Sequence, residues 1–297
     1  MKQARTRRPP LIGRLVVFGV GLIGGSFAAA LKKHQAVGHV VGVGRSRANL
    51  LAAKRLGIID EITSDPARAV RDADLVLIAV PLGQTRAVMT KIAPHLGPHT
   101  IVTDAGSTKR DVIEHARRSL GDAFSRFVPA HPIAGTEKSG ARAADAELFA
   151  DHLLVVTPER ATDPRAVKRV LAAWKLAGMR TVSMDADEHD RVLALTSHLP
   201  HVVAYALAGQ IAGYADAKRL FQYTGGGFRD TTRIASSSTE MWRDICIANR
   251  GALLKAVDDY TAGLARMRKA IAVGNGRTLE KFFNQARAAR AKWLPKR

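Results

Sequence analysis

The chain has 297 residues, 46% of them hydrophobic, which suits one large domain or two domains of ordinary size. Its one cysteine, Cys246, excludes an internal disulfide, and we expect a reducing cytoplasm. No apolar run approaches the roughly 18 residues of a membrane span, and no secretory hydrophobic region follows the basic start, so we expect no membrane partner.

The net charge of +20 raises the question of a nucleic-acid partner. Arg and Lys are scattered over the whole length, however, and no zinc-finger spacing or RNA-binding aromatic motif is present. Aromatic residues are only 5% of the chain, too few for base-stacking platforms. We therefore expect no nucleic-acid partner. The basic residues are interpreted as a disordered tail over residues 1–13 and a solvated surface that attracts small anions.

The first motif begins with a buried strand, Leu15–Phe18, and continues into a helix over Ser26–Leu31. Between them, Gly19, Gly21 and Gly24 have the spacing G-x-G-x-x-G of a dinucleotide-binding turn. The first glycine permits the tight turn, the second lets the backbone approach a pyrophosphate, and the third lets the helix pack against the strand. Free N–H groups at the helix start would bind the phosphates. The expected contacts are Gly19, Gly21, Leu22, Ile23 and Gly24.

A second strand, Val40–Val43, ends where such folds meet the adenosine ribose. An acidic residue there would bind the 2′-hydroxyl of NAD, but Gly44 occupies the position. Arg45, Ser46 and Arg47 follow, and the two guanidinium groups are suited to a 2′-phosphate. We therefore expect NADP as the cofactor, with NAD also possible; an ordinary basic loop is the alternative.

Strand and helix patterns alternate as far as Met184, which predicts one Rossmann-type doubly wound α/β domain over residues 14–184. Ligands bind beyond the carboxyl ends of such strands, so Ser107 and His131, each directly after an expected strand, are placed at that edge. The later strands are expected at 75–80, 101–103, 127–130, 153–156 and 180–182, with helices at 49–56, 84–93 and 165–177.

From residue 185 to 297 we expect a second, all-helical domain for substrate binding and dimerisation. Helices are predicted over 192–211, 241–271 and 278–292, and Gly225–Gly227 is expected to break the series. Their apolar faces are broad for so small a domain. They predict a homodimer joined through it.

Polar clusters outside the glycine turn carry the candidate chemistry. An enzyme that oxidises an alcohol with a nicotinamide cofactor needs a base for the hydroxyl proton, and His131 or His201 would serve. Ser197 lies four residues before His201, so the two share a helix face. Arg233 is suited to hold a carboxylate bidentately. These residues point to an oxidoreductase acting on a small hydroxylated anion.

Five stretches, in this order, resemble the prephenate dehydrogenase family, which includes cyclohexadienyl and arogenate dehydrogenases. They are residues 19–26, 104–109, 131–137, 197–201 and 226–235. The resemblance implies NAD(P)-dependent oxidative decarboxylation of prephenate, arogenate or both, to 4-hydroxyphenylpyruvate, tyrosine or both, in tyrosine biosynthesis. It also implies a dimer joined through the helical domains.

The same resemblance implies roles for single residues. His131 would accept the proton of the ring hydroxyl, and Ser107 would hydrogen-bond near it. Arg233 would grip a substrate carboxylate. The residues expected to line the substrate pocket are Thr136, Ser197, His201 and Gly226, and the neighbours expected around the grip are Asp230, Glu137 and Trp242. No metal site is expected.

Two departures from the family pattern stand out. Many members carry an acidic residue where Gly44 stands, and some carry a C-terminal ACT domain or a fused mutase, for which this chain has no room. Two other functions are alternatives: a hydroxyacid-type nicotinamide dehydrogenase, which usually relies on a catalytic lysine in its helical domain, and a basic nucleic-acid-binding protein. The His131 loop and the Arg233 segment speak against the first.

Overall fold

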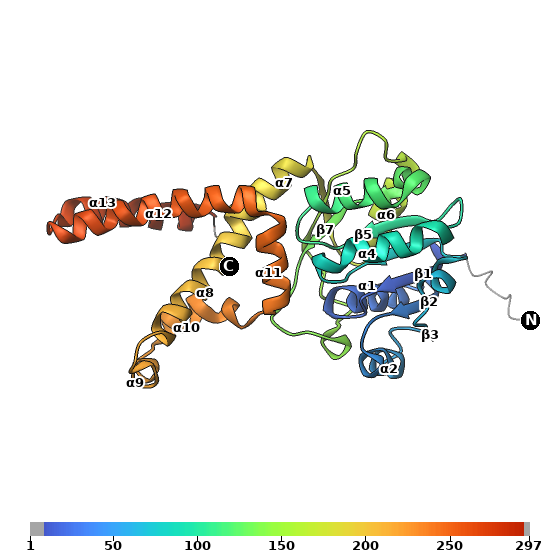
Figure 1. Cartoon of the computed structure of the whole chain (residues 1–297), viewed down its shortest axis with the longest axis horizontal. Helices are drawn as coiled ribbons and strands as arrows, with labels where there is room; N and C mark the ends of the chain where they lie inside the picture. Colours follow the sequence, from blue (N-terminus) through green and yellow to red (C-terminus); the bar gives the residue numbers. More distant parts are fainter. Residues whose placement is uncertain (1–8, 294–297) are drawn as a thin grey trace, which may run out of the picture. The chain divides into compact units, whose positions relative to one another are not determined.

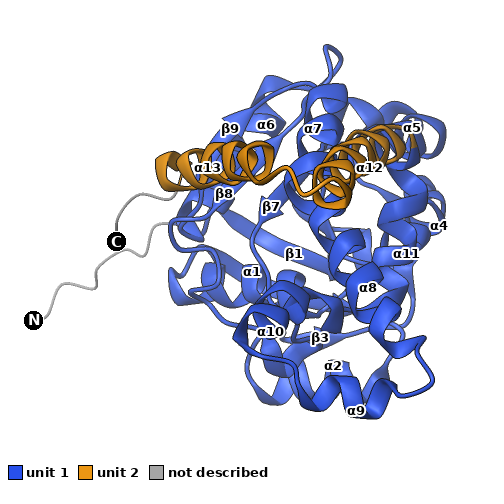
Figure 2. Ribbon diagram, turned by 90° about the vertical axis from the view of Figure 1, so that its left-hand side faces the viewer, with its two compact units in different colours: residues 1–250 blue, residues 251–297 orange. Residues whose placement is uncertain are grey.

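The computed structural model describes residues 9–293. Residues 1–8 of the expected tail lie outside that range, whereas Ile12 and Gly13 already belong to the first strand. The chain divides into two compact units, residues 1–250 and 251–297 (Figure 2).

A six-stranded parallel sheet forms the centre of the first unit, with strand order β3-β2-β1-β4-β5-β6. Figure 1 labels β1, β2, β3 and β5 of this sheet. Its order reverses between β1 and β4, which is where such folds bind dinucleotides. Every residue of β4 is buried, as expected of a strand covered on both faces. The strands are β1 (Ile12–Phe18), β2 (Val37–Val43), β3 (Glu61–Ile62), β4 (Leu75–Ile78), β5 (Ile101–Asp104) and β6 (Phe127–Val128).

Helices cover both faces of this sheet in two layers. Along each strand, successive side chains point alternately toward one layer and the other. Leu15 and Val17 pack into a cluster with Phe27 and Trp174, while Val16 packs into a second cluster under the opposite helices. The first layer contains α1 (Leu22–Lys33), α2 (Arg47–Arg55) and α6 (Pro164–Leu176), and the second contains α3 (Pro66–Val70), α4 (Leu82–Ile92) and α5 (Arg110–Ser119).

A separate three-stranded sheet corrects the prediction of a single sheet. Its strands are β7 (Ala130–Ile133), β8 (Leu153–Val156) and β9 (Arg180–Ser183), with β7 antiparallel to β8. The strand expected at 127–130 is divided at Pro129, which has no N–H to donate, and the Ala130 N–H bonds to the Asp104 carboxylate instead of a neighbouring strand. His131 consequently lies inside β7 rather than after a strand.

Helices make up the rest of the first unit. They are α7 (Ala186–Leu193), a π-helical turn (Ala194–His198), α8 (Leu199–Ala212), α9 (Ala217–Gln222), α10 (Gly226–Thr232) and α11 (Thr239–Ala248). The helical series breaks at residues 223–225, as predicted for Gly225, whereas Gly226 and Gly227 already belong to α10. The helix predicted over 241–271 is interrupted at Asn249, the C-cap of α11.

The helical stretch over residues 186–212 is long and apolar enough, by length and composition alone, to cross a membrane, with a hydropathy of 1.3. Its first turns carry charged residues, among them the buried Asp190. A core or interface helix satisfies the same test, so the stretch does not by itself indicate a membrane protein.

The second unit contains α12 (Arg250–Ala272), apart from its first residue, and α13 (Gly276–Trp293). No strand follows β9 in the described residues, in agreement with the predicted all-helical part. Several large apolar side chains of this unit are exposed, namely Leu254, Tyr260, Leu264, Ile271, Val273, Phe282, Phe283 and Trp293.

Candidate active site

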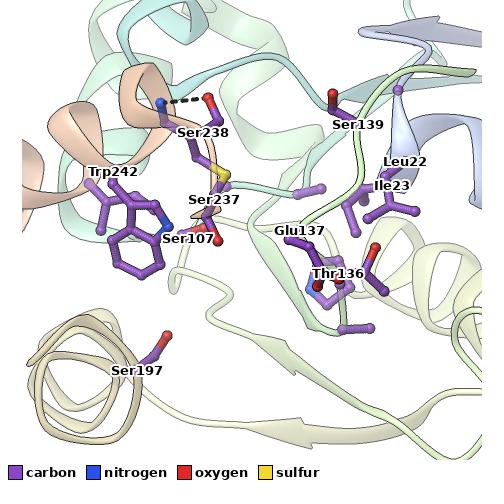
Figure 3. A pocket seen from close by; sticks show the side chains of 18 of the residues that line it. Leu22, Ile23, Ser107, Thr136, Glu137, Ser139, Ser197, Ser237, Ser238 and Trp242 are labelled. Carbon is purple, nitrogen blue, oxygen red and sulfur yellow. Dashed lines mark hydrogen bonds between the residues drawn. The ribbon is translucent and has the colours of Figure 1, made fainter. Parts of the chain in front are cut away.

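A cavity of ≈ 610 Å³ opens at the carboxyl ends of β1, β4 and β5, within the first unit (Figure 3). The glycine turn after β1 and the loop 134–140 after β7 form part of its lining. Side chains from the π-helical turn, α8 and α11 form another part. The cavity therefore joins the nucleotide-binding turn to the polar clusters of the helical region.

The glycine turn has the geometry that a pyrophosphate requires. Gly19 has a φ of +89°, and a Cβ there would lie 2.3 Å from the Ala79 carbonyl oxygen. A Cβ on Gly24 would lie 2.3 Å from the Gly19 carbonyl oxygen, so only glycine lets α1 approach the strand. Gly21 has open space beside it and is the N-cap of α1, with no side chain bonded to the helix start. The first N–H groups of this 12-residue helix are thus left for a phosphate, and Leu22 and Ile23 line the cavity beside them.

The basic loop after β2 lies outside the cavity lining. Arg45 is exposed and forms an ion pair with Glu240 of α11, with 3.4 Å between Nη2 and Oε2. The Ser46 hydroxyl caps α2 by accepting the Asn49 N–H, and Arg47 is the first residue of that helix. Ser46 therefore has a structural role, and Arg45 has a carboxylate partner already.

His131 is 9% exposed and lines the cavity. Its Nδ1 lies 2.9 Å from Nε2 of His189, which leaves Nε2 as its free ring nitrogen. Burial, with the neighbouring His189, Lys109 and His198, holds the pKa of His131 well below its ordinary value of 6.5. The ring is therefore neutral at pH 7 and able to accept a proton. Ser107, in the loop after β5, lines the same cavity but does not cap α5.

Beneath His131 lies a buried polar layer that the sequence analysis missed. Lys109, fully buried, donates to the Asp104 carboxylate and to the Ala130 carbonyl oxygen. Because Asp104 also accepts the Ala130 N–H, this ion pair fixes both backbone groups of the residue before His131. The sequence signal for such a layer is weak. It consists of polar residues at the end of a buried strand and at the start of the helix that follows.

Asn249 and His198 form another part of the missed layer. The Asn249 amide donates to the Asp190 carbonyl oxygen and to Nδ1 of His198. Burial lowers the pKa of His198 to about 4, so this ring is neutral as well. The break between α11 and α12 at Asn249 thus serves the site.

Ser197 and His201 both line the cavity, as their spacing predicts. Nδ1 of His201 lies 2.9 Å from the Ser197 carbonyl oxygen. The His201 ring stacks on Trp242 of α11, with 3.6 Å between ring centroids and 21° between planes. Burial lowers the pKa of His201, and the nearby positive charge of Arg233 adds to this effect, so the ring is a neutral wall of the cavity.

Arg233 and Glu137 face each other at the exposed side of the cavity, with 3.3 Å between Nη1 and Oε2. Both line the cavity. Thr136 lines it as well, and Figure 3 shows it near Glu137. Gly226 and Asp230, which were also expected near the substrate, are not in the lining. Arg233 and Lys138 are the Arg and Lys side chains of the lining, and Arg233 is the one paired with Glu137, so an anionic ligand can bind it by displacing that carboxylate.

Comparison with known proteins places the chain in a family. The nucleotide-binding domain of prephenate dehydrogenase matches residues 27–183, and the dimerisation domain of prephenate dehydrogenase matches residues 185–285. The chain belongs to the prephenate dehydrogenase family. Its fold is accordingly a parallel six-stranded α/β nucleotide-binding domain followed by a helical dimerisation domain.

Individual relatives agree over nearly the whole chain. A cyclohexadienyl dehydrogenase from Zymomonas mobilis is 40% identical over 93% of this chain and 94% of its own length. A prephenate dehydrogenase from Bacillus subtilis is 36% identical over 92% of this chain and 74% of its own length. The prephenate dehydrogenase of Aquifex aeolicus, solved with hydroxyphenyl propionate and NAD⁺, superposes with a TM-score of 0.88 at 32% identity, covering 97% of this chain and 99% of that one. The activity is that of a prephenate or cyclohexadienyl dehydrogenase in tyrosine biosynthesis, and the hydroxyacid-type alternative is set aside.

Proposed function

We propose that the chain is a cytoplasmic, homodimeric enzyme that oxidatively decarboxylates prephenate, arogenate or both, and uses NADP at least as well as NAD. One observation carries the proposal: a neutral, buried His131 lines the same cavity as the glycine turn and Arg233. A dinucleotide-binding turn, a base and a carboxylate-binding cation are the parts that this reaction needs.

His131 is the general base of the proposed reaction. Prephenate carries a hydroxyl on ring carbon C4 and a carboxylate on C1. A nicotinamide held by the glycine turn would accept the hydride that leaves C4. His131 takes the hydroxyl proton on Nε2 as C4 becomes a carbonyl carbon. The C1–CO₂ bond then breaks and releases CO₂. Its electron pair moves through the ring to the C4 oxygen, which takes back a proton as the ring becomes aromatic. Ser107 supports this step by hydrogen-bonding to the hydroxyl beside His131.

The rest of the cavity orients the substrate. Arg233 holds one substrate carboxylate in place of Glu137, while Ser197 and Thr136 offer hydroxyls to its polar groups. His201, fixed by its stack on Trp242, forms a flat wall for the ring. Gly226 acts on the substrate site indirectly. It is the first residue of α10, and this helix ends at Thr232, directly before Arg233.

The cofactor assignment rests on the α1 glycine turn for the pyrophosphate and on Arg45 and Arg47 for a 2′-phosphate. Gly44 is exposed, and no carboxylate stands in its place to repel that phosphate. Arg45 would exchange Glu240 for the phosphate when NADP binds.

Replacing His131 tests the proposed base directly. We expect His131→Asn, close in shape but not basic, to lower kcat with prephenate by about 10²–10⁴-fold, because a general base contributes about that much. NADPH binding, followed by its fluorescence, should survive. His99→Asn, on an exposed histidine outside the cavity lining, is the matched control and should leave kcat unchanged.

The pH profile gives a second test of the same assignment. Because the pKa of His131 is lowered, the deprotonated, active form persists as the pH falls through 6.5, and activity should be lost only at lower pH. If His131→Asn retains more than about a tenth of the parent kcat, the base is another group and His201 becomes the candidate.

A further inference from the structure

Behind His131, a chain of buried side chains leads away from the cavity. Nδ1 of His131 lies 2.9 Å from Nε2 of His189, and Nδ1 of His189 lies 2.7 Å from Oδ1 of Asp190. His189 is fully buried, and Asp190 is 3% exposed. Neither residue lines the cavity, so neither can touch a ligand there.

Asp190 is held in place as an ionised acceptor. Its carboxylate accepts the backbone N–H groups of Lys109 and Arg110, at 2.8 and 3.1 Å, at the start of α5. Burial alone would raise the pKa of Asp190, but the hydrogen bonds from His189 and these two N–H groups hold it below its ordinary value. An ionised carboxylate only accepts hydrogen bonds, so the proton between Asp190 and His189 is on Nδ1 of His189.

The protonation of His189 in turn decides that of His131. Burial lowers the pKa of His189 more than the hydrogen bond to Asp190 raises it, so His189 is neutral. With its proton on Nδ1, Nε2 of His189 is an acceptor, and the group that donates to it is Nδ1–H of His131. The lone pair of the neutral His131 ring is therefore on Nε2, the nitrogen not used in this chain.

We propose that His189 and Asp190 are positioning residues that select the tautomer of His131 and so keep its Nε2 lone pair available in the cavity. The inference rests on the proposed role of His131 as the base. A buried aspartate does the same for the histidine of Ser–His–Asp triads, where an asparagine in its place produces the wrong tautomer. Here a second histidine stands between the aspartate and the base.

Charges on the neighbouring elements agree with this role. Lys109 is paired with Asp104 of β5, so these two buried charges cancel. His198 of the π-helical turn is neutral. Asp190 acts on the adjacent ring instead: its hydrogen bond and its negative charge both raise the pKa of His189, against the larger effect of burial.

The tautomer itself can be measured in the full-length protein without substrate. Histidine-selective ¹⁵N labelling and two-bond ¹H–¹⁵N correlations report which ring nitrogen carries the proton. We expect Nδ1 of His131 to be protonated and Nε2 to be free. A parent protein with the proton on Nε2 would overturn the proposal without any variant, and this readout does not depend on whether His131 is the catalytic base.

Asp190→Asn tests the origin of the tautomer. Oδ1 of Asp190 accepts both the Lys109 N–H and Nδ1–H of His189, and Oδ2 accepts the Arg110 N–H. An asparagine that keeps its oxygen on the Arg110 N–H turns its NH₂ toward Nδ1 of His189. The proton of His189 then moves to Nε2, and His131 becomes protonated on the cavity side. We expect the NMR signature to invert and kcat to fall by about 10²–10⁴-fold, with KM nearly unchanged. Asp187→Asn, on an exposed carboxylate of the same helix, is the matched control.

Two replacements of His189 separate positioning from packing. The side-chain carbonyl of His189→Gln can still accept Nδ1–H of His131, whereas His189→Leu offers no acceptor. We expect the glutamine variant to exceed the leucine variant in kcat by at least about tenfold, at similar thermal stability. Equal kcat values in the two, or an unchanged tautomer and kcat in Asp190→Asn, would show that the chain serves packing alone.

Discussion

At the scale of single residues, the cavity separates its functional groups by depth. His131 lies on the buried side, where desolvation keeps the ring neutral, and Arg233 lies on the exposed side with 63% of its side chain accessible. Its pair with Glu137 is therefore screened by solvent and weak. A dianionic substrate can replace Glu137 at little cost, so the two residues hold the position that a substrate carboxylate would take.

Arg233→Ala should consequently weaken substrate binding. A hydrogen bond to a charged group contributes about 1.5–3 kcal/mol, which corresponds to a rise in KM for prephenate on the order of 10- to 100-fold. kcat should change less, because the lost contact is made in ground state and transition state alike. Arg233→Lys should restore binding only in part, since an ammonium lacks the planar fork. Arg229→Ala, one turn earlier on α10 and outside the lining, serves as control, and an unchanged KM in Arg233→Ala would refute the assignment.

At the scale of elements, the local parts of the site were predictable and the long-range parts were not. The positive φ of Gly19, +89°, and the close approach of Gly24 to the Gly19 carbonyl oxygen both arise within a few residues of one turn, so the local spacing of the glycines can predict them. The division at Pro129 into two sheets depends on Asp104, which is 26 residues away from Ala130. The contact between His131 and His189 joins residues 58 apart. The periodic spacing of apolar residues predicts helices and strands, but it does not predict contacts between residues so far apart in the sequence.

The region around Ser197 shows an intermediate case. The four-residue spacing to His201 correctly predicted a shared face, but the π-helical turn over Ala194–His198 was not anticipated. Such turns insert one extra residue per turn and often occur at functional sites. This one brings His198 into the buried layer while Ser197 still reaches the cavity.

The connection between β2 and α2 should set cofactor choice. We expect the parent enzyme to use NADP at least as well as NAD, judged by kcat/KM. Gly44→Asp should shift the ratio toward NAD by about tenfold or more, since a carboxylate would accept the 2′-hydroxyl and repel a 2′-phosphate. A Cβ at Gly44 meets only the Leu50 side chain, at 3.6 Å or more, so the variant should fold, and Gly44→Ala controls for the added atom. A parent that favours NAD by more than about tenfold, or about 1.4 kcal/mol, would show that Arg45 does not bind a phosphate.

At the scale of the whole molecule, the exposed apolar surface of the second unit points to assembly. Within α12, Tyr260, Leu264 and Ile271 are 39%, 46% and 63% exposed. At 100° per residue these three positions share one face of the helix. Contiguous exposed apolar surface of this kind marks interfaces, and it lies within the region that matches the dimerisation domain.

We therefore expect a homodimer in solution at micromolar concentration, measured by light scattering. Leu264→Asp places a charge in the middle of the apolar face and should shift the mass toward the monomer, because burying an unpaired carboxylate at an interface is costly. Ala262→Asp adds the same charge two residues earlier, on the opposite side of α12, and should leave the dimer intact. Retained helical circular dichroism in both variants would exclude unfolding as the cause of a change in mass. A parent that is monomeric, or a Leu264→Asp variant that stays dimeric, would place the interface elsewhere on the chain.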